Sequence, residues 1–217
     1  MSPFPTEPVS PREFIEDVIP SLFAEWVLDD EFERVDFKLG LSLCGREGGD
    51  WTLHFIEGEM GIAEGLAEDC GLTLLQSVAD WRGALWEGRP GVVADSVRIL
   101  TEQGPPGLAA RAEQGAPRNR EALRELETLT GRIDAIVAGE HAPDWRVGIH
   151  VGPGPIPGEP RATIRVGADQ AESIRRGELH PVEALMTGQL RLEGDLGLIL
   201  QLQAIAMAAS MPPATPS

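Results

Sequence analysis

The side chains best suited to chemistry at neutral pH are four histidines and two cysteines. His54 and His150 stand out, because each lies in a segment that begins Asp-Trp, at Asp50 and at Asp144. Two imidazoles so placed would suit a shared site for proton transfer or metal binding. Histidines that point outward from strands are more commonly solvated, however, and we expect this of both. The sequence contains no His-x-x-x-His or Cys/His spacing, so we predict neither a metal site nor a cofactor.

The candidate nucleophiles lack the neighbours that would activate them. Cys44 and Cys70 have no adjacent thiol, so we expect reduced cysteines that pack as small apolar groups. No serine lies in a Gly-x-Ser-x-Gly turn. The prolines within residues 152–158 remove backbone donors that a phosphate-binding loop needs. We therefore predict no catalytic residues and favour binding over catalysis. An enzyme that acts on a hydrophobic substrate through His54 or a carboxylate is an alternative.

The elements that would hold a site are clearest in the first half. Over residues 35–43 apolar side chains alternate with polar or small ones, which predicts a half-buried strand, and residues 51–55 predict its hairpin partner. Helical spacing predicts a helix from Pro11 that is kinked at Pro20, and another over 78–87 that ends at Gly88. Weaker strand patterns cover residues 59–66, 72–75 and 97–100.

The second half is predicted to repeat this order. The pattern indicates helices over 120–137, 168–176 and 196–209, and strands over 145–151, 162–166 and 190–192. The words Asp50–Leu53 and Asp144–Val147 recur in register. We predict an α+β protein of two similar halves, residues 11–104 and 120–210, joined by a Gly- and Pro-rich linker over 105–119. Each half would form a small antiparallel-rich sheet with helices packed on one face. A chance similarity between two α+β halves is the alternative.

Residues 177–195 read GELHPVEALMTGQLRLEGD, which combines a helix end at Gly177, a proline turn, a short helix, a strand and a Gly-Asp pair before an apolar helix. This order resembles the sterol carrier protein type-2 family, most clearly over residues 161–209. Residues 144–166 fit the upstream strands of that family, one strand short. The resemblance implies an α+β fold that encloses an apolar cavity, closed by the final helix.

The resemblance further implies binding or carriage of an apolar or amphipathic small molecule, such as a lipid, an acyl chain or a sterol-like molecule, in a hydrophobic tunnel. The candidate wall residues are apolar side chains of both halves: Phe37, Leu39, Leu41, Ile164, Met186, Leu190, Leu192, Leu198 and Leu202. The apolar helix over 196–209 would equally suit a plain core or a dimer interface. A non-catalytic structural or interaction protein that uses the same fold as a scaffold is therefore the alternative function.

Composition restricts the partners. The net charge of −17 disfavours nucleic acid and anionic membrane surfaces. No segment reaches the ~20 apolar residues of a membrane-spanning helix, and no secretory signal pattern is present, so we expect a cytoplasmic protein. Its expected partner is a hydrophobic small molecule, with a homo-oligomer or a protein partner left open. Lys38 is the only lysine, and the many Ala, Gly, Pro and Arg residues are typical of a GC-rich bacterial genome.

Overall fold

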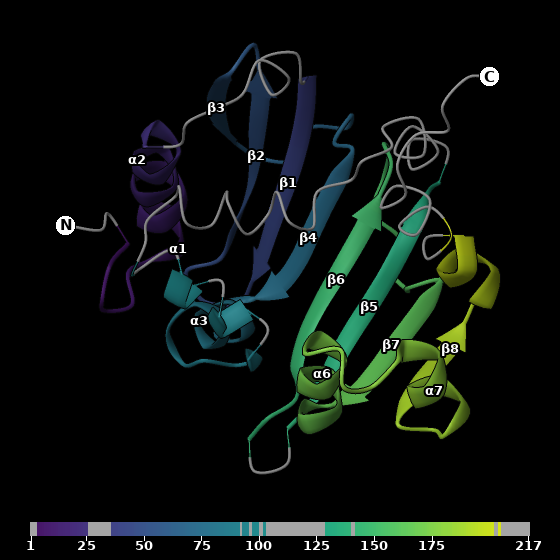
Figure 1. Ribbon diagram of the computed structural model, residues 1–217. Coiled ribbons are helices and arrows are strands. Elements are labelled where there is room, and N and C mark those ends of the chain that lie inside the picture. The colour runs from purple at the N-terminus through teal and green to yellow at the C-terminus, as the bar shows by residue number, and fades with distance from the viewer. Residues whose placement is uncertain are drawn as a thin grey trace, which may run out of the picture.

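A mixed eight-stranded sheet with helices packed on it forms the fold in the computed structural model (Figure 1). The structure describes residues 4–25, 36–91, 93–95, 97–99, 102, 129–139, 142–201 and 204. The strand order is β3-β2-β1-β4-β6-β5-β7-β8, with parallel and antiparallel neighbours. The α+β class predicted from the sequence is confirmed.

The first half begins its sheet where the alternation predicts a strand. β1 (Asp36–Cys44) and β2 (Gly49–Ile56) form the expected antiparallel hairpin, and β3 (Glu59–Glu64) extends it beyond β2. β4 (Leu72–Ser77) then returns to pair with β1 in parallel. α3 (Val78–Trp86) follows directly. Its N-terminus is capped by Ser77, whose hydroxyl accepts from the Asp80 amide at 3.0 Å, and the chain leaves it through Gly88 at φ +69°.

The helical segment that precedes this sheet is interrupted where Pro20 enters. α1 (Pro11–Glu13) continues into a π-helical turn, η1 (Phe14–Val18), and then into α2 (Ile19–Ala24). A proline has no amide to donate and clashes with the preceding turn, and a π-helical turn is one way to absorb such a residue. The disturbance predicted at Pro20 therefore takes the form of a widened turn rather than a break.

The second half supplies four strands and two helices. They are β5 (Gly131–Ala138), β6 (Trp145–Val151), β7 (Ala162–Gly167), α6 (Ala168–Arg175), α7 (Pro181–Met186) and β8 (Leu190–Gly194). The predicted helix over 120–137 is wrong for residues 131–137. Ile133 and Val137 suit either period, but β5 is hydrogen-bonded to β6 on one side and to β7 on the other, and this pairing decides the outcome. Residues 103–128, and with them the predicted linker, lie outside the described residues.

The two halves meet where β4 pairs with β6 in antiparallel fashion, from Leu72 opposite Val151 to Leu75 opposite Gly148. Beyond α3, the strand predicted over residues 97–100 is wrong for residues 97–99, which are helical. Arg98 stabilises the helical arrangement through ion pairs at spacings of three and four residues, with Asp95 at 3.6 Å and Glu102 at 3.3 Å.

One face of the sheet is largely apolar from β2 to β7. Cross-strand neighbours define a continuous row on this face: Trp51, Leu41, Leu74, Ile149, Ile133 and Ala162. Helical residues such as Phe14 and Trp81 cover this face over the first half. The opposite face carries Thr52, Thr73 and His150 at the alternate positions. Successive side chains of each strand point to opposite faces of the sheet. The apolar side chains therefore gather on one face, which helices can bury.

A cluster of charged residues joins α6 to the helical segment within 91–102. Arg175 and Arg176 both donate to Glu172 from their Nε atoms, at 2.8 Å, and Arg175 also pairs with Asp95 at 2.7 Å. Hydrogen bonds from Arg175, followed by Arg176, hold the pKa of Glu172 at about 2, against 4.5 for an ordinary glutamate. Glu172 is therefore charged throughout the range in which other glutamates titrate.

This cluster predicts acid sensitivity. Because the pKa of Glu172 is lower in the folded state, the unfolded state binds more protons between about pH 4.5 and pH 2. The contribution of Glu172 to the free energy of unfolding should be complete above pH 4.5 and should disappear as the pH falls towards 2. In urea denaturation measured across this range, Glu172→Gln should flatten the pH dependence of stability. The exposed Glu193→Gln variant is the control and should keep the wild-type slope; equal slopes for all three proteins would contradict the prediction.

Candidate functional site

An apolar pocket of about 380 Å³ lies in the second half, on the apolar face of the sheet. All its lining residues carry aliphatic or proline side chains: Ile133, Ile164, Pro181, Val182, Leu185, Leu190, Leu192 and Ile199. They come from β5, β7, β8, α7 and the helical residues that follow Asp195. With no polar side chain among these lining residues, the pocket is suited to hydrocarbon.

The register of β7 and β8 places the side chains that form the floor of this pocket on one face of the sheet. Ile164 lies opposite Leu192 in β8, and Val166 lies opposite Leu190, so these side chains share a face. α7 forms the opposite wall. It starts at Pro181, with the Val182 amide donating to Nδ1 of His180 at 3.2 Å.

Glycines bracket α7 on both sides. Gly177 and Gly188 both have φ near +73°, a conformation that other residues resist. The two left-handed residues turn the chain out of α6, and then out of α7 into β8. They therefore allow a six-residue helix to stand over the end of the sheet.

Asp195 anchors the helical residues that close the pocket. Its Oδ1 accepts from the Leu198 amide at 3.1 Å, and its other oxygen pairs with Arg161 at 2.5 Å. The Leu198 amide first, and then Arg161, lower the pKa of Asp195. The capped turn directs Leu198 into a small cluster with Ile133 and Ala162, where only 3% of its surface is exposed.

The candidate wall residues of the second half are only partly brought together. Ile164, Leu190 and Leu192 line the pocket, and Leu198 is buried in the cluster beside it. Met186 points elsewhere, with 84% of its surface exposed. Leu202 lies outside the described residues.

Sequence reasoning missed five residues of the lining. Pro181, Val182 and Leu185 lie inside the segment that carried the family resemblance, so the short helix at its centre was the available signal. Ile199 lies in the final helix, next to a residue that was predicted. Ile133 was hidden by its assignment to a helix.

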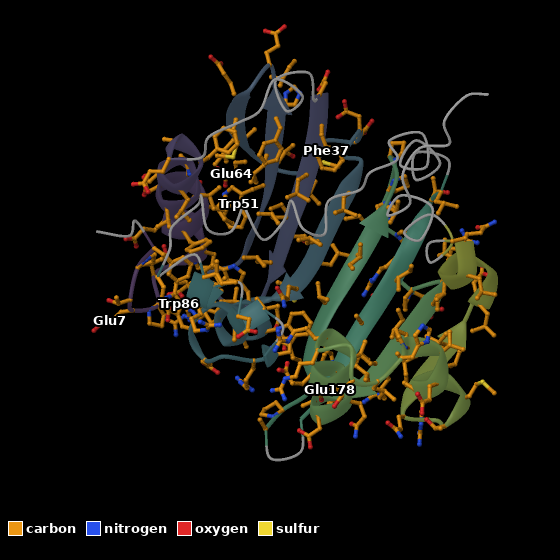
Figure 2. The ribbon with its side chains drawn as sticks, viewed as in Figure 1. Glu7, Phe37, Trp51, Glu64, Trp86 and Glu178 are labelled. Carbon is orange, nitrogen blue, oxygen red and sulfur yellow. The ribbon has the colours of Figure 1, made fainter. Side chains whose placement is uncertain are left out.

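Two of the three candidate wall residues of the first half, Leu39 and Leu41, pack against a buried cluster that includes Trp51. Phe37 lies outside this cluster, with 38% exposure (Figure 2). Four aromatic rings belong to or pack against the same cluster. Phe4, Phe14, Trp81 and Trp86 pack edge to face or tilted, with centroid separations from 5.2 to 6.0 Å.

The residues first considered for chemistry are dispersed. His54 is partly exposed and pairs with Asp36 at 2.7 Å, whereas His150 is buried, with 4% exposure, so the expected solvation of His150 is wrong. Cys70 is buried as expected, but Cys44 is exposed at the end of β1. Among the described residues, no group of histidine, cysteine and carboxylate side chains is arranged to hold a metal ion.

Comparison with known proteins agrees with this geometry. Residues 111–207 match the model of the SCP-2 sterol transfer family. The resemblance expected from residues 177–195 is therefore confirmed, and it extends over most of the second half. A curated relative, hydroxysteroid dehydrogenase-like protein 2 of Xenopus tropicalis, is 32% identical over 92 residues. That match covers 40% of this chain and 21% of the relative, so it spans about a fifth of the relative's length.

Solved structures give more distant matches. Sterol carrier protein 2 from Yarrowia lipolytica in its apo form is 15% identical, with a TM-score of 0.34, and the match covers 58% of this chain and 98% of that one. The sterol carrier protein domain 2 of Helicoverpa armigera is 16% identical, with a TM-score of 0.33 and coverage of 58% and 91%. The resemblance to the SCP-2 sterol transfer family thus rests on the sequence match over residues 111–207. In the described part of the chain, no helix is long and apolar enough to span a membrane.

Two leucines of the same helix provide a test of how the pocket is closed. Leu198 is buried in the cluster with Ile133, whereas Leu196 is 50% exposed. Leu198→Ala should lower the free energy of unfolding by about 2–5 kcal/mol, because it leaves a cavity in the cluster. Leu196→Ala should change it by no more than about 0.5 kcal/mol. Chemical denaturation of both variants decides the point, and equal losses would mean that the helix packs differently.

Proposed function

We propose that this protein binds and carries an apolar or amphipathic small molecule, such as a lipid, an acyl chain or a sterol-like molecule, in the pocket of the second half. The observation that carries the proposal is the wholly apolar lining of that pocket beneath α7. Burial of hydrocarbon against such walls is favourable by about 25 cal/mol per Å² and requires no specific polar contact. The match of this region to a sterol transfer family supports the same class of ligand.

The first half has a different role in this proposal. Aromatic side chains cover part of its apolar face, whereas among the described residues of the second half the buried cluster consists of Ile133, Ala162 and Leu198. On the apolar face of the sheet, space for a hydrocarbon ligand is therefore expected in the second half. The first half would act as a scaffold, and the scaffold alternative weighed for the whole chain is retained for this part.

We also infer that the halves are repeats of one unit. The strands β2-β1-β4 and β6-β5-β7 have the same order and the same relative directions. The bond from the Gly71 amide to the Lys38 carbonyl, at 3.0 Å, has a counterpart from Arg161 to Arg132, at 2.8 Å. These bonds support an alignment of Lys38 with Arg132 and of Gly71 with Arg161.

This alignment gives a physical reason for the difference between the halves. It matches Trp51 with Val147. The recurring Asp-Trp sequences would instead match Trp51 with Trp145, so the two alignments differ by two residues. It also matches Leu41 with Ala135, and Leu72 with Ala162. At each of these positions the second half has the smaller side chain, which supports an open pocket there and a filled one in the first half.

Substitution of the pocket lining tests the proposed function. An amide on an apolar wall costs about 1–3 kcal/mol when it finds no partner, so Ile164→Gln or Leu192→Gln should weaken binding of a fluorescent fatty acid roughly 5- to 150-fold. Both side chains are only partly buried in the free protein, which limits the loss of stability. Fluorescence titration of the folded variants gives the dissociation constants.

The matched control is Met186→Gln, which makes a similar change on the exposed side of α7. Its dissociation constant should remain within about twofold of the wild-type value. Failure of the unmodified protein to bind the fatty acid or a fluorescent sterol at micromolar concentration would overturn the carrier proposal. Equal weakening by all three substitutions would place the site elsewhere.

A further inference from the structure

The polar face of the sheet carries a cavity that the apolar-ligand proposal does not use. Its volume is about 830 Å³, within the usual range of about 300–1,000 Å³ for small-molecule sites. Thr73 of β4 and Cys70, just before that strand, line it, together with residues of the β3–β4 and β6–β7 loops: Leu66, Ala67, Glu68, Asp69, Gly152, Pro153, Gly154, Pro155 and Ile156. None of these described residues lines the pocket under α7, which lies on the opposite face of the sheet.

Hydrogen bonds hold the two loops against the sheet and against each other. The Thr52 hydroxyl donates to the Gly65 carbonyl at 2.7 Å and accepts from the Ala67 amide at 2.9 Å, which fixes the β3–β4 loop on β2. The Gly154 amide donates to the Glu68 carbonyl at 2.8 Å and joins the β6–β7 loop to the β3–β4 loop. The walls of the cavity are therefore set by the fold itself.

The Thr73 hydroxyl is the unexplained polar group of this cavity. Thr73 lines the cavity although only 3% of its surface is exposed. Its side chain lies over Gly40, where a Cβ would be 2.6 Å from the hydroxyl oxygen, so β1 offers it no side chain as a partner. Within the described part of the chain, this hydroxyl makes no hydrogen bond. A buried hydroxyl without a partner is costly, and a bound molecule with a polar atom at this place would satisfy it.

The charged groups of the cavity are carboxylates. Glu68 and Asp69 are the charged side chains among its described lining residues. Asp69 already has a partner, because Nζ of Lys38 donates to it at 2.5 Å. Glu68 makes no ion pair within the residues that the structure describes, so a cation can pair with it without displacing another group. The net charge of −17 also favours a cation over an anion.

We infer that this cavity is a second binding site, for a small amine whose ammonium group pairs with Glu68 and whose apolar body ends in a hydroxyl that hydrogen-bonds to Thr73. Apolar side chains such as Leu66, Pro155 and Ile156 suit the body. Glu68 is exposed whereas Thr73 is buried, so the ammonium group lies at the mouth of the cavity and the hydroxyl at its base. This ligand differs in class from the hydrocarbon proposed for the pocket under α7, and the inference does not depend on that proposal.

The δ1 methyl groups of the isoleucines test the inference, because they report on the two sites separately. Ile156 lines this cavity, whereas Ile164 and Ile199 line the pocket under α7. Tyramine carries both proposed polar groups, 4-ethylphenol lacks only the amine, and phenethylamine lacks only the hydroxyl. In an NMR titration at millimolar concentration, tyramine should shift the Ile156 methyl resonance in a saturable way and leave those of Ile164 and Ile199 in place.

The ammonium group is tested against Glu68. Wild-type protein should bind 4-ethylphenol roughly 2- to 5-fold more weakly than tyramine, the range for an exposed ion pair. Glu68→Gln should weaken tyramine binding by the same factor and give the two ligands equal affinity. Glu59→Gln removes an exposed carboxylate of β3 outside the cavity, and this control should keep the wild-type affinity for tyramine.

The hydroxyl group is tested against Thr73. Wild-type protein should bind phenethylamine roughly 2- to 10-fold more weakly than tyramine, the range for one neutral hydrogen bond. Thr73→Val keeps the shape of the side chain, and it should bind tyramine and phenethylamine with equal affinity. Leu192→Gln, in the pocket under α7, should leave the affinity for tyramine unchanged. Should Thr73→Val fail to fold, the three ligands and Glu68→Gln still test the site.

Three results would overturn the inference. The first is an Ile156 methyl resonance that tyramine does not shift at any concentration up to its solubility limit. The second is equal affinity of the wild-type protein for tyramine and 4-ethylphenol, since the ammonium group would then contribute nothing. The third is a tyramine response confined to Ile164 and Ile199, which would place the amine in the pocket under α7.

Discussion

The antiparallel pairing of β4 with β6 is the interaction on which the rest of the structure depends, because it joins the strands of both halves into one sheet. Without it, each half would expose an unpaired edge in the middle of the molecule, with the free backbone groups that make such edges prone to association. The pairing also makes β6 the antiparallel neighbour of β4, in the same way that β8 is the antiparallel neighbour of β7. The Gly152 amide donates to the Gly71 carbonyl at 3.0 Å, and the Asp195 amide donates to the Arg161 carbonyl at 2.7 Å. In the repeat proposed above, β4 therefore lies beside β6 as β3 lies beside β2.

The same pairing gives the two faces of the sheet their separate surroundings. On the apolar face it makes one continuous row, which aromatic side chains cover in the first half and α7 with its neighbours covers in the second. On the polar face it brings Thr73 beside His150 and sets the β3–β4 loop against the β6–β7 loop. Each face has a hollow, and the two hollows differ in their lining: aliphatic and proline side chains line the one on the apolar face, whereas Thr73, Cys70 and residues of the two loops line the one on the polar face.

Sequence patterns were sufficient for the elements whose signals are local. The strand predicted by the alternation over 35–43, the helix that ends at Gly88 and the helix that ends at Gly177 are confirmed. Their signals are the alternation of apolar side chains, a capping residue and a glycine in the left-handed conformation, and each signal lies within a few neighbouring residues. The pattern failed at β5, because β-branched residues spaced four apart fit a helix and a strand equally well. The segment forms a strand because it pairs with β6 on one side and with β7 on the other. It also failed at residues 97–99, where a short apolar–polar–apolar run is compatible with a strand but the residues are helical.

The full lining of the pocket could not be predicted from local sequence patterns. Leu190 and Leu192 could be named because the strand period shows which side chains share a face. The exposure of Met186 follows from how α7 sits over β8, and the filling of the first half follows from helices and rings that come from separate parts of the chain. For His150, the strand position was readable, but the expected solvation was wrong, because the alternation of a strand does not show whether its polar face is covered by other parts of the chain.

Intermolecular nuclear Overhauser effects between palmitate and isoleucine methyl groups give the most direct test of an open second half and a filled first half. The chain would be deuterated, with protonated ¹³C-labelled isoleucine δ1 methyl groups, and the fatty acid would be protonated. Cross-peaks from the acyl chain to Ile133, Ile164 and Ile199 are the expected result, because these residues line the pocket. Cross-peaks confined to Ile15 and Ile62, which pack in the first half, would show that the apolar ligand binds where we find a filled core, and would contradict the assignment.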